Sequence, residues 1–457
     1  MSVVGRALLS ATLRMRKSGG LRAYGEIAGA LRAPREQVLA AQLASVRELL
    51  AYAERWVPYY RQTFRELGIT SRDVRSLDDF AQLPVLTKDV VRERQRELLS
   101  EDPAVGPLVT FHSGGSTGVP LTFFHDPQYL DYAMATDFRT FAQAGWRPGD
   151  MTALFWGWPK GMYRMSRAEF EVRQWLRRDY QFDAFRSGPE DMDRWARTMR
   201  RLRPAIAVGY ASTVARFAEH LVRTGQRMRP LKGVFTTAEK LYPPQREALE
   251  AAFGCRVYDC YGSSEVRNVA AECPAGRMHV NADGVLLEVG EPLPGSGLSP
   301  FIVTSLRSRG MPFIRYRNED CGALVDGECD CGNGAPLVRL EIARVSDNFV
   351  LPGGHVVHGL FFTHRLYGSR GIANFQFHQT APNHITLWVV PVPGEAAERE
   401  ASIKRLLADF AALSPVPITI DVRETDHIPL SAAGKHRYTR SDVAPTEALQ
   451  AVHTGRA

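Results

Sequence analysis

The sequence predicts an α/β protein with two domains of unequal size. Between residues 105 and 305, short apolar runs rich in β-branched and aromatic residues alternate with segments of helical periodicity. This alternation is typical of a sheet whose strands are largely buried between helices. Beyond residue 345 the pattern changes to two neighbouring strands, a helix and a further strand. We therefore expect a large domain over residues 1–345 and a small α+β domain over residues 346–457, joined near residues 343–349.

The first predicted elements are an N-terminal arm and a helix. Residues 1–35 are rich in Arg and Lys and contain one acidic residue, Glu26, so we expect a basic arm. Residues 36–53 then show helical periodicity, and Pro58 ends the pattern. The predicted apolar face of this helix consists of Leu39, Leu43, Val46 and Leu50.

The central region supplies the predicted sheet. Five apolar runs predict strands at residues 151–156, 205–210, 233–237, 256–261 and 301–306. A helix is predicted between the second and third of them, because its apolar residues recur at a spacing of three and four. These residues are Val214, Phe217, Ala218, Leu221 and Val222.

The C-terminal region predicts a hairpin, a helix and a last strand. The two β-rich runs are residues 372–379 and 385–392, and the turn between them contains Pro382 and Asn383. A strand is predicted at residues 417–422. The helix before it places Ile403, Leu406, Leu407, Phe410 and Leu413 on one face.

Composition excludes several classes of protein. Of 457 residues, 44% are hydrophobic and 23% are charged, which is typical of a folded globular chain. The net charge of +7 is dilute for this length and predicts no nucleic-acid partner. No apolar run approaches the roughly 18 residues that span a bilayer, although a weak amphipathic membrane contact near residues 3–13 stays open. The six cysteines do not form a disulfide pattern, so we expect a reducing cytoplasm; a homodimer stays open.

The segment Phe111–Pro120, FHSGGSTGVP, is the most informative single motif. Its glycines allow backbone N–H groups to converge, and its hydroxyls add further donors, which suits phosphate oxygens. A flexible surface loop is the alternative interpretation of the same composition. It is not a Walker A motif, because no Gly-Lys-Ser/Thr follows.

Three further motifs follow in chain order. DCYGSSE over residues 259–265 puts an aromatic residue, a glycine turn and a carboxylate after a strand. IRYRNEDCG over residues 314–322 brings Asp320 after an apolar run, and LSAAGKHR over residues 430–437 carries one lysine on a glycine turn. Taken singly, these motifs also fit ordinary turns with a solvated charge.

Together and in this order, the motifs resemble the adenylate-forming superfamily of acyl-CoA synthetases, in its phenylacetate-CoA ligase-like and CapK-like branch. The resemblance extends to YAERWVPYYR over residues 52–61, to LPVLTK over residues 83–88 and to TTAE over residues 236–239. It implies that ATP and a carboxylate give an acyl-adenylate, from which a thiol displaces AMP. ATP, Mg²⁺ and coenzyme A are the implied cofactors and substrates.

The resemblance also implies roles for particular residues. The phosphates of ATP would contact the loop Ser113, Gly114, Gly115, Ser116, Thr117 and Gly118. Glu265 would bind Mg²⁺. Adenine would lie between Tyr261 and Gly262 on one side and Ala238 and Glu239 on the other, and Asp320 and Arg344 would contact the ribose. The implied ATP/AMP-binding set is completed by Asp259, Ser263 and Ser264.

Lys435 is the implied catalytic lysine of the small domain. It would contact the carboxylate and the α-phosphate as charge develops in the transition state. Asp347 would be the hinge about which this domain rotates between the half-reactions, bringing Gly353 and Gly354 towards the acceptor. Three positions depart from the family pattern: Gly115 in the loop, Asn318 with Glu319 before Asp320, and Ala343 at the hinge.

Cys273, His279, Cys329 and Cys331 offer the ligand types of a closed tetrahedral Zn²⁺ site. Ordinary half-buried thiols are the alternative, because the spacing is not that of a standard zinc finger. The branch has similar Cys and His residues after the YGSSE motif, which implies a structural zinc.

The sequence also predicts the class of acid substrate and the acceptor of the acyl group. Trp156, Tyr210 and Phe235 are candidates for the wall of an acyl pocket, although each also fits a core position. We expect an aromatic or other small apolar acid and coenzyme A as acceptor. The alternatives are transfer to an amine or a carrier-protein thiol, and a non-catalytic binding protein with a degenerate ligase fold.

Overall fold

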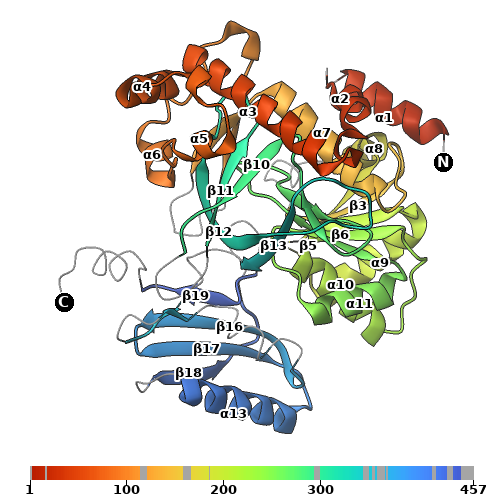
Figure 1. Cartoon of the computed structure of the whole chain (residues 1–457). Coiled ribbons are helices and arrows are strands. Elements are labelled where there is room, and N and C mark those ends of the chain that lie inside the picture. Colours follow the sequence, from red (N-terminus) through yellow and green to blue (C-terminus); the bar gives the residue numbers. More distant parts are fainter. Residues whose placement is uncertain are drawn as a thin grey trace. The chain divides into compact units, whose positions relative to one another are not determined.

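The chain forms two compact units in the computed structural model, which describes residues 3–15, 18–113, 121–157, 166–184, 186–292, 299–342, 349–352, 356–357, 366, 369–413, 418–429 and 436–443. The first unit comprises Met1–Val289, Phe301–Asn318 and Ala323–Arg339. The second unit comprises Gly290–Pro300, Glu319–Gly322 and Leu340–Ala457 (Figure 1). Of the predicted joint at residues 343–349, residues 343–348 with the hinge Asp347 lie outside the described residues.

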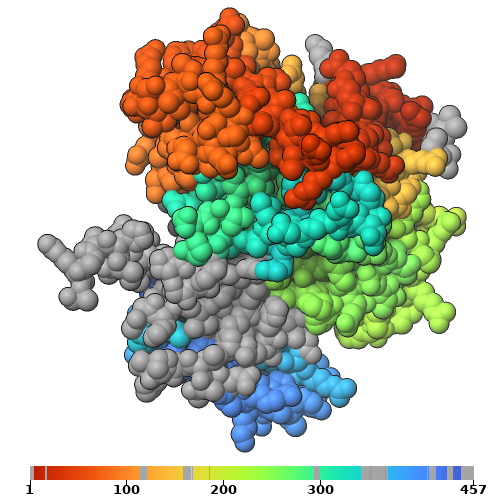
Figure 2. All heavy atoms as spheres, viewed as in Figure 1, coloured from red at the N-terminus to blue at the C-terminus, as the bar shows by residue number. Residues whose placement is uncertain are grey.

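The basic N-terminal segment is folded against the first unit. Two helices, α1 (Val3–Met15) and α2 (Gly20–Ile27), occupy most of it. The Thr12 hydroxyl donates to the carbonyl of Leu176 over 3.0 Å, and the Gly19 N–H donates to the Asp131 carboxylate over 2.7 Å. Figure 2 shows these red helices lying against the surface of this unit. The segment predicted as an arm is therefore part of a packed surface.

The next helices are α3 (Arg35–Trp56), α4 (Pro58–Leu67), α5 (Leu77–Ala81) and α6 (Lys88–Glu93). The predicted helix is confirmed as α3, but its buried face is rotated from the predicted one. Leu39 and Leu43 are only half-buried. The fully buried positions are Val38, Gln42, Val46, Leu49, Leu50 and Ala53. Gln42 is tolerated inside because its amide donates to the carbonyl of Val285 over 2.8 Å.

Most residues of a large sheet belong to the first unit, and the described strands of this sheet run in the order β10-β11-β12-β13-β9-β8-β7-β6-β5-β3-β4. Their bounds are β3 Thr152–Trp156, β4 Asp179–Asp183, β5 Ile206–Tyr210, β6 Gly233–Thr237, β7 Val257–Tyr261, β8 Ala270–Glu272, β9 Met278–Val280, β10 Val285–Val289, β11 Pro300–Ser305, β12 Tyr316–Val325 and β13 Leu337–Ile342. The five strands β4-β3-β5-β6-β7 are parallel. All five predicted strands and the α/β class are confirmed.

Helices pack on both faces of the parallel strands. They are α7 (Pro127–Ala142), α8 (Arg167–Arg177), α9 (Pro189–Leu202), α10 (Ala211–Arg223) and α11 (Pro243–Phe253). One core cluster joins the strands to α9, α10 and α11, while α7 contributes to a second cluster through Phe138 and Phe141. The predicted apolar face of α10 is wrong at one position: Val222 is not buried, because 61% of this residue is exposed.

A separate hairpin flanks the predicted phosphate loop in sequence. It consists of β1 (Val109–His112) and β2 (Thr122–His125), which pair antiparallel. Ser113 follows β1 and Leu121 precedes β2. The Ser113 N–H donates to the Leu121 carbonyl over 2.8 Å, and the Leu121 N–H donates to the Ser113 hydroxyl over 2.9 Å. These bonds fix the two ends between which residues 114–120 run.

The second unit contains a four-stranded sheet with the order β18-β17-β16-β19. Its elements are β14 Phe349–Val350, β15 Val356–Val357, β16 Ile372–Ala381, β17 His384–Pro391, α13 Ala396–Leu413, β18 Thr419–Glu424 and β19 Thr439–Ser441. The predicted hairpin, helix and strand are confirmed. Leu406 and Phe410 of α13 pack on Phe377 and Leu387 of the sheet, and Leu407 is half-buried.

No helix in the described ranges combines the length and the apolar character needed to cross a bilayer.

Candidate active site

The DCYGSSE motif forms the end of β7 and the tight turn that follows it. Ser263 closes this turn, because its hydroxyl accepts from the Val266 N–H over 2.9 Å and its own N–H donates to the Val266 carbonyl over 3.1 Å. Gly262 is required by a close approach: a Cβ atom there would lie 2.8 Å from the backbone nitrogen of Asn268. Ser264 and Glu265 lie between the two residues that these bonds join.

Glu265 is a buried carboxylate, with 6% of the residue exposed. The hydroxyl of Tyr316, a fully buried residue at the start of β12, donates to Glu265 Oε1 over 3.2 Å. A carboxylate removed from water normally requires such a partner. The predicted Mg²⁺ ligand is therefore fixed by a side chain from the IRYRNEDCG motif.

Tyr261 is fixed by the same motif. The side-chain amide of Asn318 donates to the Tyr261 hydroxyl over 2.7 Å, and the ring of Tyr261 lies 5.8 Å from that of Phe301 between centroids. Asn318 is itself 6% exposed. Asn318, which departs from the family pattern, thus contacts Tyr261, the residue that is predicted to border the adenine.

His125 of β2 joins the hairpin to this turn. Its Nε2 atom lies 3.0 Å from the carbonyl oxygen of Ser264, and its ring contacts Phe111 and Tyr129. Burial lowers the pKa of His125 to about 4, so the ring is neutral near pH 7. In that form Nε2 carries the hydrogen and donates to Ser264. Sequence reasoning missed His125, because no motif contains it.

Asp259 points into a charged network below the turn. Its carboxylate accepts from the Thr236 hydroxyl over 3.1 Å, while its own N–H donates to the carboxylate of Glu272, which pairs with Arg246 over 2.8 Å. Desolvation, followed by the charge of Glu272, raises the pKa of Asp259 to about 7. These contacts account for Asp259 as a group that supports the strand. Its predicted role towards ATP stays a prediction.

Ala238 and Glu239 follow β6, the neighbour of β7. Ala238 adopts a left-handed backbone with φ of 67°, which is uncommon for a residue with a Cβ atom and is concentrated at functional sites. Glu239 accepts a hydrogen bond of 2.8 Å from the N–H of Ser212, in the first turn of α10. The positive end of that helix favours the carboxylate.

Two of the three proposed acyl-pocket residues lie together. The rings of Trp156 and Tyr210, at the C-terminal ends of adjacent strands β3 and β5, are 4.3 Å apart between centroids, and Trp156 is 37% exposed. Phe235 is different, because it is fully buried and stacks on Tyr258 at 4.9 Å within the core. The core interpretation therefore accounts for Phe235 in this structure, whereas Trp156 remains accessible to a ligand.

Several predicted residues lie outside the described residues: Gly114, Gly115, Ser116, Thr117, Gly118, Arg344, Asp347, Gly353, Gly354 and Lys435. Asp320 is described as a half-buried residue of β12 and is part of the second unit. The structure therefore brings together Tyr261, Gly262, Ser263, Ser264 and Glu265 with Tyr316 and Asn318, all within the first unit.

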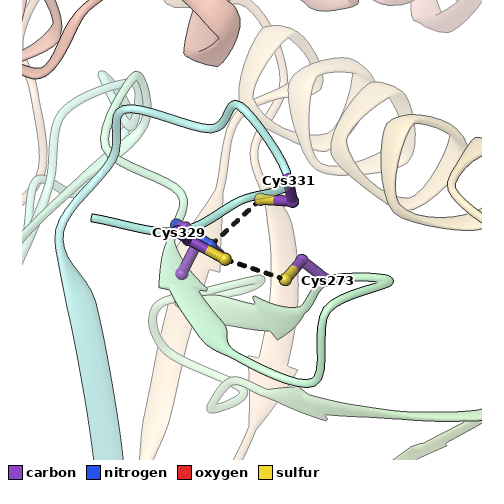
Figure 3. Close-up of side chains that lie close together, drawn as sticks. Cys273, Cys329 and Cys331 are labelled. Atoms are coloured by element: carbon purple, nitrogen blue, oxygen red, sulfur yellow. Dashed lines mark hydrogen bonds between the residues drawn. The ribbon is translucent and has the colours of Figure 1, made fainter. Parts of the chain in front are cut away.

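The three cysteines and the histidine predicted as metal ligands do converge. The Sγ atoms of Cys273, Cys329 and Cys331 and a ring nitrogen of His279 all lie within 4.8 Å of one another. Figure 3 shows the three cysteine side chains close together. Cys273 Sγ is 3.6 Å from Cys329 Sγ, and Cys331 Sγ is 3.4 Å from His279 Nε2. A tetrahedral site with Zn–S bonds of about 2.3 Å has ligand separations of about 3.8 Å, so these distances fit.

His279 is oriented for metal binding by a second contact. Its Nδ1 atom lies 3.2 Å from the carbonyl oxygen of Ala335, and a hydrogen on Nδ1 leaves the lone pair of Nε2 directed at the cysteines. Cys273 follows β8, His279 lies on β9, and the other two cysteines lie in the connection from β12 to β13. A bound ion would therefore join three segments of the first unit.

Comparison with known proteins identifies relatives along most of the chain. No family model matches it. Phenylacetate-coenzyme A ligase of Thermus thermophilus is 25% identical over 334 residues, covering 71% of this chain and 74% of that protein. The corresponding ligase of Pseudomonas putida is 26% identical over 332 residues, covering 68% and 72%. Protein CapK of Staphylococcus aureus is 21% identical over 420 residues, covering 87% of both chains.

Solved structures show the same fold. The crystal structure of 2-hydroxyisobutyryl-CoA ligase in the postadenylation state, in complex with 2-HIB-AMP, superposes with a TM-score of 0.71. The match covers 93% of this chain and 94% of that one at 20% sequence identity.

Proposed function

We propose that this chain activates a carboxylic acid with ATP and transfers the acyl group to coenzyme A. The reason is that it belongs with the phenylacetate-CoA ligases and CapK among the adenylate-forming enzymes. The observation that carries the proposal is the convergence at the end of β7. There, Tyr261 and Glu265 each contact a side chain of the IRYRNEDCG motif, Asn318 and Tyr316 respectively. Two motifs distant in sequence thus meet at one place, and this meeting supports the proposal.

The first half-reaction would proceed by attack of the carboxylate oxygen on the α-phosphorus of ATP, which breaks the bond to pyrophosphate. Tyr261, held by Asn318, would border the adenine, and Ser113 would contact the phosphates with the loop that follows it. Glu265 suits Mg²⁺, which prefers carboxylate oxygens and which when bound offsets the charge of the leaving pyrophosphate. Lys435 would stabilise the charge that develops on the α-phosphate.

The second half-reaction would transfer the acyl group from AMP to the thiolate of coenzyme A. A carbon–sulfur bond forms, the acyl–phosphate bond breaks, and AMP leaves. Asp347 would be the hinge that separates the two half-reactions. The exposed ring of Trp156 against Tyr210 favours an aromatic or small apolar acid as the substrate, because apolar ligands bind on such surfaces.

Structural zinc and a cytoplasmic location complete the proposal. The four converging groups Cys273, His279, Cys329 and Cys331 are all protein ligands, so the ion would have a structural role. All six cysteines are free thiols, which suits a reducing compartment.

The test is ATP–pyrophosphate exchange with Mg²⁺ over a panel of aromatic, aliphatic and hydroxylated acids. At least one acid should support exchange and, with coenzyme A added, should give its thioester. Exchange with hydroxamate formation but without a thioester would favour an amine or a carrier protein as acceptor. No exchange with any acid would contradict the proposed activity and favour the binding-protein alternative.

A further inference from the structure

We infer that Tyr316 is a positioning residue that holds Glu265 in place to receive a divalent cation. This inference rests on the proposed function only in that the cation accompanies ATP. Tyr316 itself would not touch the nucleotide. Its effect would act through the carboxylate, to which its hydroxyl donates over 3.2 Å.

The contact with Tyr316 distinguishes the two oxygens of the Glu265 carboxylate. The phenolic hydrogen is directed at Oε1 of Glu265, and among the described residues no other side chain is hydrogen-bonded to this carboxylate. Oε2 is thereby left as an acceptor. A buried carboxylate with one oxygen engaged and one oxygen open can bind a cation at little cost in reorganisation.

Tyr316 is held rigidly by its surroundings. The residue is fully buried, and its ring lies 5.0 Å from that of Phe313 between centroids. The backbone on either side is held by Leu86 of the LPVLTK segment. The Leu86 N–H donates to the Arg315 carbonyl over 2.9 Å, and the Arg317 N–H donates to the Leu86 carbonyl over 3.0 Å. The hydroxyl therefore has little freedom to follow a moving Glu265.

The LPVLTK segment is itself anchored by Arg315. The guanidinium of Arg315 donates to the carbonyls of Ala81 and Leu83 and pairs with Glu288 over 3.1 Å. Burial with several partners makes this arginine a rigid fixture. The LPVLTK segment, which the resemblance includes without a role, thus supports Tyr316 and through it Glu265.

The matched variants are Tyr316→Phe and Tyr60→Phe, made in the full-length chain. Tyr60 is also buried, and its hydroxyl donates to the Pro312 carbonyl over 2.9 Å and accepts from the Ile314 N–H over 3.1 Å. Its loss removes buried hydrogen bonds in the same region, and no contact joins it to Glu265 among the described residues. A purely structural role for Tyr316 would make the two variants behave alike.

The first readout is the binding of Mn²⁺, measured by electron paramagnetic resonance of the free ion in the presence of α,β-methylene-ATP. We expect Tyr316→Phe to weaken Mn²⁺ binding about 10-fold, the size typical of losing an outer contact to a metal ligand. Tyr60→Phe should stay within about 2-fold of wild type. Equal Mn²⁺ affinities of wild type and Tyr316→Phe, or equal losses in the two variants, would overturn the inference.

A double-mutant cycle distinguishes an effect of Tyr316 through Glu265 from a general folding defect. In a Glu265→Gln background the carboxylate is gone, so adding Tyr316→Phe should cause no further loss of Mn²⁺ affinity. Additive losses would show that Tyr316 acts through the fold in general and would overturn the inference. Wild-type Mn²⁺ binding without exchange for any acid would contradict the proposed activity alone, which keeps the two failures distinct.

Discussion

The side-chain amide of Asn318 donates a hydrogen bond of 2.7 Å to the hydroxyl of Tyr261, across 57 positions of sequence. This bond fixes the ring that we expect to border the adenine of ATP. We predict that Asn318→Leu raises the KM for ATP about 5-fold with a smaller change in kcat, because a neutral hydrogen bond contributes about 1 kcal/mol. Steady-state exchange kinetics measure both constants. Tyr261→Phe should give the same change, and combining the two should add nothing; fully additive effects would show that the bond has no such role.

Lys435→Ala should reduce pyrophosphate exchange at least about 100-fold, as expected for loss of a preorganised charge in the transition state. Formation of the thioester from a synthetic acyl-adenylate should change much less. The control is Lys404→Ala, which removes an exposed lysine of α13 in the same unit. Near-normal exchange in Lys435→Ala would exclude the assigned role.

Protein purified without added metal should contain about one equivalent of zinc by elemental analysis. Cys329→Ser combined with Cys331→Ser should abolish zinc binding and lower the Tm, because binding energy at a structural site is folding energy. Cys255→Ser alters a half-buried thiol outside the cluster and should retain the metal. A metal-free wild type with unchanged stability would rule the site out.

His125 should make the first unit less stable in mild acid. Its pKa is about 4 when folded and about 6.5 when unfolded, because burial disfavours the charged ring. The unfolded state therefore binds the proton more readily, and stability falls as the pH drops from about 7 through 4. Linkage gives a loss of about 2 kcal/mol by pH 5.

The measurement is the free energy of unfolding in urea for wild type and His125→Gln at pH 7.5 and pH 5. Asp259 acts in the opposite direction, since its raised pKa favours the folded state as the pH falls. It is present in both proteins, so the difference between them isolates His125. An identical pH dependence of wild type and His125→Gln would show that the ring does not titrate as described.

The sequence predicted five strands of the large sheet and missed others, both short buried ones such as β8 and the polar strand β4. Strand β5, Ile-Ala-Val-Gly-Tyr, has no charged or hydroxyl-bearing aliphatic residue, as expected for a strand covered on both faces. Strand β4, at the end of the sheet, reads Asp-Tyr-Gln-Phe-Asp and carries no such signal. The buried face of α3 was misplaced because Gln42 is buried through a bond to a residue 243 positions away.

The residues of the candidate site could likewise be predicted only in part. Motif residues such as Glu265 and the four metal-binding candidates could be named from the chain, because their types and spacing suggest chemistry. Tyr316 and His125 could not be assigned their contacts, since these arise from segments 51 and 139 positions apart. Tertiary packing determines which buried polar groups meet, and local pattern contains no record of it.

The closeness of Cys273 and Cys329 has a consequence for oxidative stress. Their sulfur atoms are 3.6 Å apart, and a shift of about 1.5 Å would bring them to the length of a disulfide bond. An ion that binds both thiolates would block this reaction, whereas an oxidant strong enough to form the disulfide would expel the ion. Oxidation would then remove the ion that joins β8, β9 and the segment before β13. Loss of the metal and loss of local order would therefore occur together.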